Sequence, residues 1–173
     1  MNKTTELIKA IILLPITMLV LVPSLIIYLS RPFHLFCGLK FPEATFICGI
    51  SLLLTSIGIT FMLNTVFLFF TVGDGTPRPS EPPKHFVVAG PYGYVRNPMM
   101  LSALSILLGE VILFGSFPLL IYCFIFWVLN ITYFIYVEES ELAKRFGNDY
   151  LKYKKNVRRW IPRLKPWKPN NYP

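Results

Sequence analysis

Long apolar stretches alternate with short polar segments along the chain, and this pattern predicts membrane-spanning helices. The stretches that are long and apolar enough to cross a bilayer lie at about 7–29, 44–72, 98–114 and 117–137. Pro15 and Pro23 interrupt the first stretch, but prolines are tolerated in membrane helices because neighbours satisfy the freed backbone groups. Only Gly115 and Ser116 separate the last two stretches, so we expect an antiparallel helical hairpin there.

The composition agrees with this pattern and excludes other classes of protein. Of the 173 residues, 54% are hydrophobic and only 15% are charged, whereas a soluble domain carries roughly 25% charged residues. So few charges cannot cover a surface that faces water, which excludes a soluble globular enzyme. Disorder is excluded because it requires low hydrophobicity. The sequence therefore predicts an all-α, polytopic membrane protein with about four transmembrane helices.

The basic residues predict the orientation of these helices. Four crossings place both termini and the 73–97 loop on one side of the membrane. That side then holds 15 of the 17 basic residues, all except Arg31 and Lys40. Because basic residues collect on the cytoplasmic side, we expect both termini to be cytoplasmic. The basic tail requires no nucleic-acid partner, since orientation and contact with anionic lipid headgroups account for it.

The tail after the last apolar stretch has the pattern of an amphipathic helix. Apolar residues recur there at steps of three or four, at Leu142, Phe146, Tyr150, Tyr153, Val157 and Trp160. A basic amphipathic helix that follows a membrane span is expected to lie in the membrane interface. We expect Gly147 and Asn148 to break this helix into two segments, and residues 162–173 to be extended.

These elements predict a single membrane domain over residues 1–173. Its parts are two helices in 1–72, a cytoplasmic loop in 73–97, the helical hairpin in 98–137 and a cytoplasmic amphipathic tail in 138–173. The 73–91 loop is dense in turn-forming residues and is either a plain linker or an ordered lid over a site. Composition favours the linker.

The first of two polar clusters lies at the cytoplasmic start of the third apolar stretch. Asn97 followed by Pro98 is typical of an N-cap and the first position of a helix. The N–H groups of the helix start, together with the guanidinium of Arg96, would suit a carboxylate or a phosphate. The alternative is an orientation-setting arginine beside an ordinary helix cap.

The second cluster comprises Glu138, Glu139 and Glu141, at the cytoplasmic end of the fourth stretch. One interpretation is that these carboxylates pair with Lys144, Arg145 or other basic residues of the tail. The other is a carboxylate pair that holds a cationic ligand. Because the hairpin brings both clusters to the same end, a zwitterionic ligand would suit them together.

Other residues with possible chemistry give weaker signals. Glu110 lies within the third stretch, where a carboxylate is costly, and we favour a side chain that reaches toward the outer interface over a functional role. The three cysteines, Cys37, Cys48 and Cys123, form no C-x-x-C pair, and His34 and His85 are isolated, so no metal site is expected.

Several motifs in a fixed order resemble one known family of membrane enzymes. The segment 90–100, then a helical hairpin, then Glu138-Glu139 followed by Phe146-Gly147 and by Arg159-Trp160, is similar to the isoprenylcysteine carboxyl methyltransferases. The wider group includes the membrane phospholipid methyltransferases. The resemblance covers residues 73–163, and the 75–83 loop resembles the small bacterial members, which implies a bacterial inner membrane.

The resemblance implies an S-adenosylmethionine-dependent methyltransferase that acts on a lipid-like or isoprenylcysteine-like acceptor in the bilayer. The acceptor would be a membrane lipid or a prenylated small molecule. The implied catalytic residues are Arg96, Asn97 and Glu139. The implied cofactor-binding residues are Tyr92, Tyr94, Arg96, Asn97, Pro98, Glu138, Glu139, Tyr150, Tyr153 and Arg159.

The chain departs from the family pattern at a few positions. Asn97 stands where the family usually has a histidine, so a general base at that position is not available. Met100 and Ser102 also differ from the commonest residues. Two alternatives remain from the sequence: a membrane reductase of similar architecture that uses NADPH, and a non-enzymatic scaffold or transporter subunit.

Overall fold

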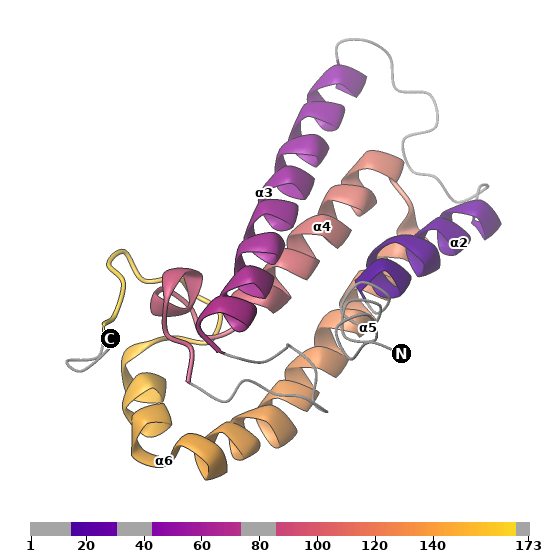
Figure 1. Ribbon diagram of the computed structural model, residues 1–173. Coiled ribbons are helices and arrows are strands. Elements are labelled where there is room, and N and C mark those ends of the chain that lie inside the picture. Colours follow the sequence, from indigo (N-terminus) through magenta and orange to yellow (C-terminus); the bar gives the residue numbers. More distant parts are fainter. Residues whose placement is uncertain (1–14, 31–42, 74–85, 169–173) are drawn as a thin grey trace, which may run out of the picture. The chain divides into compact units, whose positions relative to one another are not determined.

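The part of the chain that the structure describes is mostly helical, as the apolar pattern predicts. The computed structural model describes residues 15–30, 43–73 and 86–168, and no strand occurs within these ranges. The helices are α2 (Val22–Leu29), which continues a π-helical turn over Thr17–Leu21, then α3 (Glu43–Thr71), α4 (Pro98–Phe114), α5 (Phe117–Tyr133) and α6 (Glu139–Asn156) (Figure 1). The all-α prediction is confirmed, and the limits of α3 and α4 match the predicted stretches closely.

Two of the apolar segments are long enough to cross a membrane. They lie in Glu43–Leu68 and Phe117–Asn156, whereas Thr17–Leu29 and Pro98–Phe114 are apolar but shorter. A helix of the length of α4 rises about 26 Å, against a hydrocarbon thickness of about 30 Å. Four crossings and cytoplasmic termini therefore stay predictions. Several basic residues on which the orientation rests, such as Lys3 and Lys40, lie outside the described residues.

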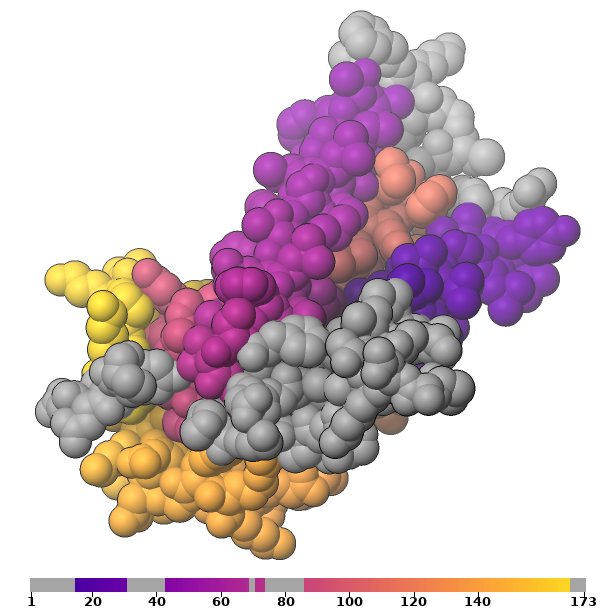
Figure 2. All heavy atoms as spheres, in the orientation of Figure 1, coloured from indigo at the N-terminus to yellow at the C-terminus, as the bar shows by residue number. Residues whose placement is uncertain are grey.

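Helix α3 exposes its apolar side chains rather than burying them. Only 11% of its most apolar window is buried, and Phe46, Leu52, Leu63 and Phe67 are among its exposed residues. Atoms of α3 lie at the surface along the helix in Figure 2. The core helix of a soluble protein is mostly buried, so this exposure indicates a helix whose solvent is lipid.

The link between α4 and α5 has the predicted form. The backbone of Gly115 adopts a φ of 55°, in the left-handed region that favours glycine. Its N–H donates to the carbonyl of Val111 at 2.8 Å, and the Ser116 hydroxyl accepts the N–H of Leu119 at 3.4 Å. Gly115 therefore ends α4, and Ser116 caps the start of α5.

The chain divides into two compact units, which are described separately below. The first, called the apolar unit here, comprises Met1–Thr60 and Ser102–Val128, and the second, the tail unit, comprises Phe61–Leu101 and Leu129–Pro173. The prediction of one membrane domain stays a prediction.

In the apolar unit, α3 and α4 approach closely through small residues (Figure 1). A Cβ atom added to Gly58 would lie 2.8 Å from the carbonyl oxygen of Ser102, and one added to Gly109 would lie 3.0 Å from that of Ser51. The Ser51 hydroxyl donates to the carbonyl of Gly109 at 2.8 Å. Helices in membranes associate in this way because lipid provides no hydrophobic force to bring them together.

Glu110 of α4 is partly buried. One of its carboxylate oxygens, Oε2, is buried with no hydrogen-bond partner among the described residues. The expectation that this side chain reaches toward the outer interface stays a prediction.

The tail unit has an aromatic core of its own. Val88, Tyr150, Tyr153 and Val157 are its buried residues, and Phe86, Leu142, Ala143, Phe146 and Trp167 pack against them. We refer to these nine residues as the tail core. The predicted apolar face of the tail helix is thus real, but the protein covers much of it. We expected the membrane interface to cover it, yet residues before α4 and after α6 supply apolar partners.

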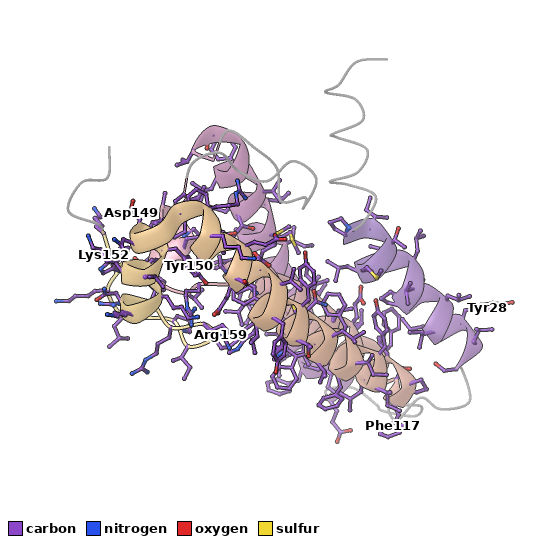
Figure 3. All side chains as sticks on the ribbon, turned by 90° about the horizontal axis from the view of Figure 1, so that it is seen from below. Tyr28, Phe117, Asp149, Tyr150, Lys152 and Arg159 are labelled. Carbon is purple, nitrogen blue, oxygen red and sulfur yellow. The ribbon has the colours of Figure 1, made fainter. Side chains whose placement is uncertain are left out.

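Helix α6 bends at the predicted position. Gly147 has a φ of 51° and a ψ of −125°, which are not helical values. In Figure 3, Tyr150 lies on the inner side of the bend, while Asp149 and Lys152 point away from it. The bend turns the second half of α6 toward the tail core.

The segment after α6 runs along the loop that precedes α4. The N–H of Arg96 donates to the carbonyl of Arg158 at 2.9 Å, that of Arg163 to Tyr94 at 2.9 Å, and that of Trp167 to Gly93 at 2.8 Å. The predicted extended segment is therefore held by backbone hydrogen bonds as far as Trp167. Residues 169–173 and the loop residues 74–85, where we weighed a linker against a lid, lie outside the described residues.

Candidate functional site

The two polar clusters of the sequence meet within the tail unit. Arg96 Nη1 lies 2.8 Å from Glu139 Oε1, which joins the segment before α4 to the first residue of α6. The same oxygen receives Arg159 Nη2 at 2.7 Å, and Lys154 Nζ lies 2.6 Å from Oε2. We call Arg96, Glu139, Lys154 and Arg159 the Glu139 cluster.

The Glu139 carboxylate is buried but remains an anion. Its side chain is only 4% exposed. Burial alone would raise the pKa of Glu139, but hydrogen bonds from Lys154 and Arg159 and the charge of Arg96 outweigh it, so the pKa is lowered. A carboxylate with a lowered pKa is a weak base. The arrangement therefore suits a structural counterion better than a proton acceptor.

For Glu139, the structure favours the first interpretation of the acidic cluster, in which the carboxylates pair with basic residues of the tail. The carboxylate pairs with basic residues of the tail, Lys154 and Arg159, rather than with the nearby Lys144 or Arg145. A cationic ligand would have to displace these partners. The sequence-based role of Glu139 as a ligand for a cation thus loses support from the geometry.

Buried polar atoms lie in and beside the Glu139 cluster. Arg96 Nε and the Tyr150 hydroxyl are both buried. The pKa of Tyr150 is raised to about 12, first by burial and then by the charge of Glu139, partly offset by the charge of Arg96 and by a side-chain hydrogen bond between Arg96 and Tyr150. This dependence on Arg96 and Glu139 puts the Tyr150 hydroxyl beside the cluster.

Glu138 has a different environment from its neighbour. It is partly buried, and no ion pair to it is found among the described residues. Burial raises the pKa of Glu138 to about 7, with smaller contributions from the negative charges of Glu141 and Glu139. An acid whose pKa lies near neutrality is suited to exchange a proton or to bind a cation.

The predicted helix cap before α4 is confirmed. Asn97 Oδ1 accepts the N–H of Met100 at 3.2 Å, and Pro98, the first residue of α4, is buried. Pro98 has no N–H, and the N–H of Leu101 donates to the Asn97 carbonyl. At most the N–H of Met99 is left for an anion, so the start of α4 offers fewer free N–H groups than the sequence suggested.

The tyrosines of the proposed site have structural contacts. The Tyr153 hydroxyl donates to the carbonyl of Tyr92 at 2.8 Å, which ties α6 to the 90–93 turn. Burial, followed by the charges of Tyr153 and Glu138, raises the pKa of Tyr92. Tyr94 is exposed and contributes a carbonyl to Arg163.

Sequence reasoning did not select two residues that the structure adds to the site. Lys154 belongs to the Glu139 cluster, but its partner lies 15 positions away, and no local spacing rule connects the two. Phe134 is buried, and the guanidinium of Arg159 lies 5.9 Å from the centroid of its ring. A cation above a buried aromatic ring holds Arg159 in place. Only the fold could show both contacts.

Comparison with known families identifies the family of this chain. The model of the phospholipid methyltransferase family matches residues 44–149, more than half of the chain. The chain belongs to the phospholipid methyltransferase family. Comparisons with curated proteins and with solved structures gave no match.

Membership in the phospholipid methyltransferase family confirms the resemblance seen in the motifs. It implies methyl transfer to lipid-type acceptors in a membrane, and the exposed apolar helices agree with a membrane setting. The matched region includes Arg96, Asn97, Glu138 and Glu139 but ends before Tyr150. The reductase and scaffold alternatives receive no comparable support.

Proposed function

We propose that this protein is an S-adenosylmethionine-dependent methyltransferase whose acceptor is a lipid-like molecule, either a phospholipid or an isoprenylcysteine-like acid. The observation that carries the proposal is the meeting of Arg96, Glu138 and Glu139 in one unit of a chain that belongs to the phospholipid methyltransferase family. The partners are then the bilayer and an acceptor within it.

The groups in the tail unit fit the charges of this cofactor. S-adenosylmethionine has an ammonium, a carboxylate and a positively charged sulfur that bears the methyl group to be transferred. Glu138, which has no ion pair among the described residues, would hold the ammonium. Arg96, whose guanidinium is largely buried, would be the donor for a carboxylate or phosphate.

Glu138 is also better suited than Glu139 to accept a proton. Its pKa of about 7 matches the working range of a general base, whereas the three cations around Glu139 hold the pKa of that carboxyl low. An amine acceptor must lose a proton, and Glu138 is suited to receive it. A carboxylate acceptor requires no base.

Asn97 contributes by position rather than by proton transfer. Its side-chain oxygen caps α4 through the N–H of Met100, and an amide does not act as a base near neutral pH. The cap fixes the start of α4 directly after Arg96. Methyl transfer depends on the alignment of its reactants, and a rigid segment of this kind provides alignment.

The acceptor is expected to arrive from the bilayer. Apolar side chains of α3 and α5 are exposed along both helices, and such surfaces are compatible with lipid chains. We propose an integral membrane location in a bacterial inner membrane, with both termini and the tail unit on the cytoplasmic side, where S-adenosylmethionine is made.

The proposal is tested by cofactor binding in nanodiscs. We expect labelled S-adenosylmethionine to bind the wild-type protein, and Glu138→Gln to weaken binding about tenfold, because a charged partner of the ammonium is lost. Glu141→Gln is the matched control, since Glu141 is an exposed acid one turn away. Mass analysis of lipids from cells with and without the protein then identifies the methylated acceptor.

An absence of cofactor binding would contradict the proposal. If folded protein binds no S-adenosylmethionine in detergent or in nanodiscs, the cofactor assignment is wrong. Binding of NADPH under the same conditions would instead favour the reductase alternative.

A further inference from the structure

The loop that follows α6 exposes two apolar side chains. Within residues 161–168, called the basic loop here, Ile161 is 61% exposed and Leu164 is fully exposed, at 102%. We refer to these two side chains as the apolar tip. Figure 2 shows the atoms of this loop, in yellow, at the surface of the molecule. Single exposed apolar residues are common on protein surfaces, so the setting of the apolar tip decides whether it has a partner.

Aromatic contacts hold both ends of the basic loop. Trp167 packs against the tail core, with its ring centroid 5.8 Å from that of Tyr153, and its N–H donates to the carbonyl of Gly93. Just before the loop, the centroid of the Trp160 ring lies 6.5 Å from that of Phe134. The two ends of the loop are therefore fixed to the tail unit.

Arg163 fixes the shape of the loop between these ends. Its backbone N–H donates to the carbonyl of Tyr94 at 2.9 Å, and its guanidinium donates to the carbonyls of Asn156 and Lys165. The apolar tip stays exposed in spite of these contacts. A loop that is held in one shape loses little conformational freedom when a partner covers it, which favours binding.

The surroundings of the apolar tip are cationic. Between residues 151 and 168 the chain has eight basic residues and no acidic residue. Two of the basic residues belong to the Glu139 cluster, but Lys165 and Lys168 in the loop and Arg158 before it are exposed. Apolar side chains among cations complement a bilayer that contains anionic lipids, because the acyl region accepts the former and the headgroups attract the latter.

The backbone contacts of the basic loop place it near the start of a predicted membrane span. The Arg163 N–H bonds to Tyr94, and Tyr94 precedes Pro98, the first residue of α4, by four positions. Four residues span at most about 14 Å, even when the chain is fully extended. The loop therefore has a short connection to the membrane boundary.

We propose that the basic loop docks into the leaflet on its side of the membrane, with the apolar tip inserted below the headgroups. Lys165 and Lys168 then bind anionic lipids. The sequence assigned membrane contact to the apolar face of α6, but the tail core covers much of that face, and the loop after the helix makes the contact in its place. This inference does not depend on the cofactor or the reaction proposed above.

Photocrosslinking of the full chain in vesicles identifies what covers the apolar tip. Leu164 is replaced by p-benzoylphenylalanine, which reacts on irradiation with nearby C–H bonds, and the mass of the intact adduct identifies the partner. The vesicles contain equal parts of phosphatidylcholine and phosphatidylglycerol with the same acyl chains, so that the two adducts differ in mass. Circular dichroism verifies folding, and the same replacement at Ile161 is the second probe.

Control positions and charge variants accompany these probes. Leu63 of α3 is 64% exposed and should give lipid adducts, whereas Asp149 is exposed and points away from the bend of α6 in Figure 3 and should give few. The charge variant combines Lys165→Gln with Lys168→Gln. Lys144→Gln is its matched control, because Lys144 is an exposed cation of α6 outside the basic loop.

We expect the probe at Leu164 to give lipid adducts in a yield comparable with that at Leu63. Phosphatidylglycerol adducts should be in about fivefold excess, the factor that corresponds to one cation near an anionic surface. Lys165→Gln combined with Lys168→Gln should remove most of this excess, and Lys144→Gln should leave it unchanged.

Three results would overturn the inference. Lipid adducts at Leu63 of the folded protein, with none at Leu164 or Ile161, would show that the apolar tip stays in water. Crosslinked dimers would assign the tip to a second copy of the chain. Equal amounts of the two lipid adducts, unchanged by the charge variant, would show that anionic lipids are not the partner.

Discussion

Different interactions stabilise the inside of each of the two units. In the apolar unit, Gly58 and Gly109 allow α3 and α4 to approach closely, and the Ser51 hydroxyl bonds to a carbonyl. In the tail unit, an aromatic core and the Glu139 cluster provide the contacts. Helices surrounded by lipid gain little from burying apolar surface, whereas segments in water gain most of their stability that way. The apolar unit therefore depends on the close approach of two helices, and the tail unit on its aromatic core and ion pairs.

The largest effect is expected from removal of the central carboxylate of the tail unit. Glu139→Gln leaves the buried guanidinium of Arg96 without its counterion and should destabilise the tail unit by about 3 kcal/mol. Hydrogen exchange should quicken in α6 and in residues 158–167 but not in the α3–α4 contact. Because the pKa of Glu139 is lowered, its stabilising effect is fully present above the pKa of an unfolded glutamate and is lost as the pH falls through the lower pKa of the folded state.

Exchange that quickens equally in both units would show that the units do not respond separately, and would contradict this prediction. Glu141→Gln, which alters an exposed acid of the same helix, is the control.

The corresponding test of the apolar unit concerns its glycines. Gly58→Ala and Gly109→Ala place a Cβ against backbone atoms of the facing helix, so each should destabilise the unit by about 1–3 kcal/mol. Thermal unfolding in detergent measures the loss. Gly49→Ala in α3 is the matched control, because a Cβ there meets nothing within 4 Å. Equal stability of all three variants would mean that close approach does not hold these helices.

A smaller effect is expected from the hydrogen bond that ties α6 to the 90–93 turn. Tyr153→Phe removes the donor to the Tyr92 carbonyl and should destabilise the tail unit by about 1 kcal/mol. The exchange rates of the Arg163 and Trp167 amides, which bond to the same segment, report the change. Tyr136→Phe should leave these rates as they are, and an unchanged rate in Tyr153→Phe would contradict the assigned contact.

The smallest expected effect is the pH dependence of S-adenosylmethionine binding. Burial raises the pKa of Glu138 to about 7, so its ionised fraction rises about threefold between about pH 6.5 and 7.5. An ammonium binds the ionised form, and S-adenosylmethionine binding should therefore strengthen about threefold over that range. The profile should be flat in Glu138→Gln and unaltered in Glu110→Gln, whose acid belongs to the apolar unit. A wild-type profile that falls with pH would contradict the role of Glu138.

Much of the local structure could be predicted from the sequence. The limits of α3 and α4, the cap at Asn97, the glycine link at Gly115 and the bend at Gly147 all follow from residues within a few positions of one another. The amphipathic face of α6 was predicted for the same reason, because helical periodicity is a local property. The family could also be recognised, since its motifs are short and ordered.

Only the tertiary structure decided which groups meet. Glu139 lies 43 positions from Arg96 and 20 from Arg159, and nothing in the local sequence states that its partners are these cations rather than a ligand. The amphipathic pattern of α6 required a cover for its apolar face but did not specify Phe86 and Trp167. Helix limits depend on neighbouring residues, whereas the pairing of charges and the cover of an apolar face depend on how distant segments fold together.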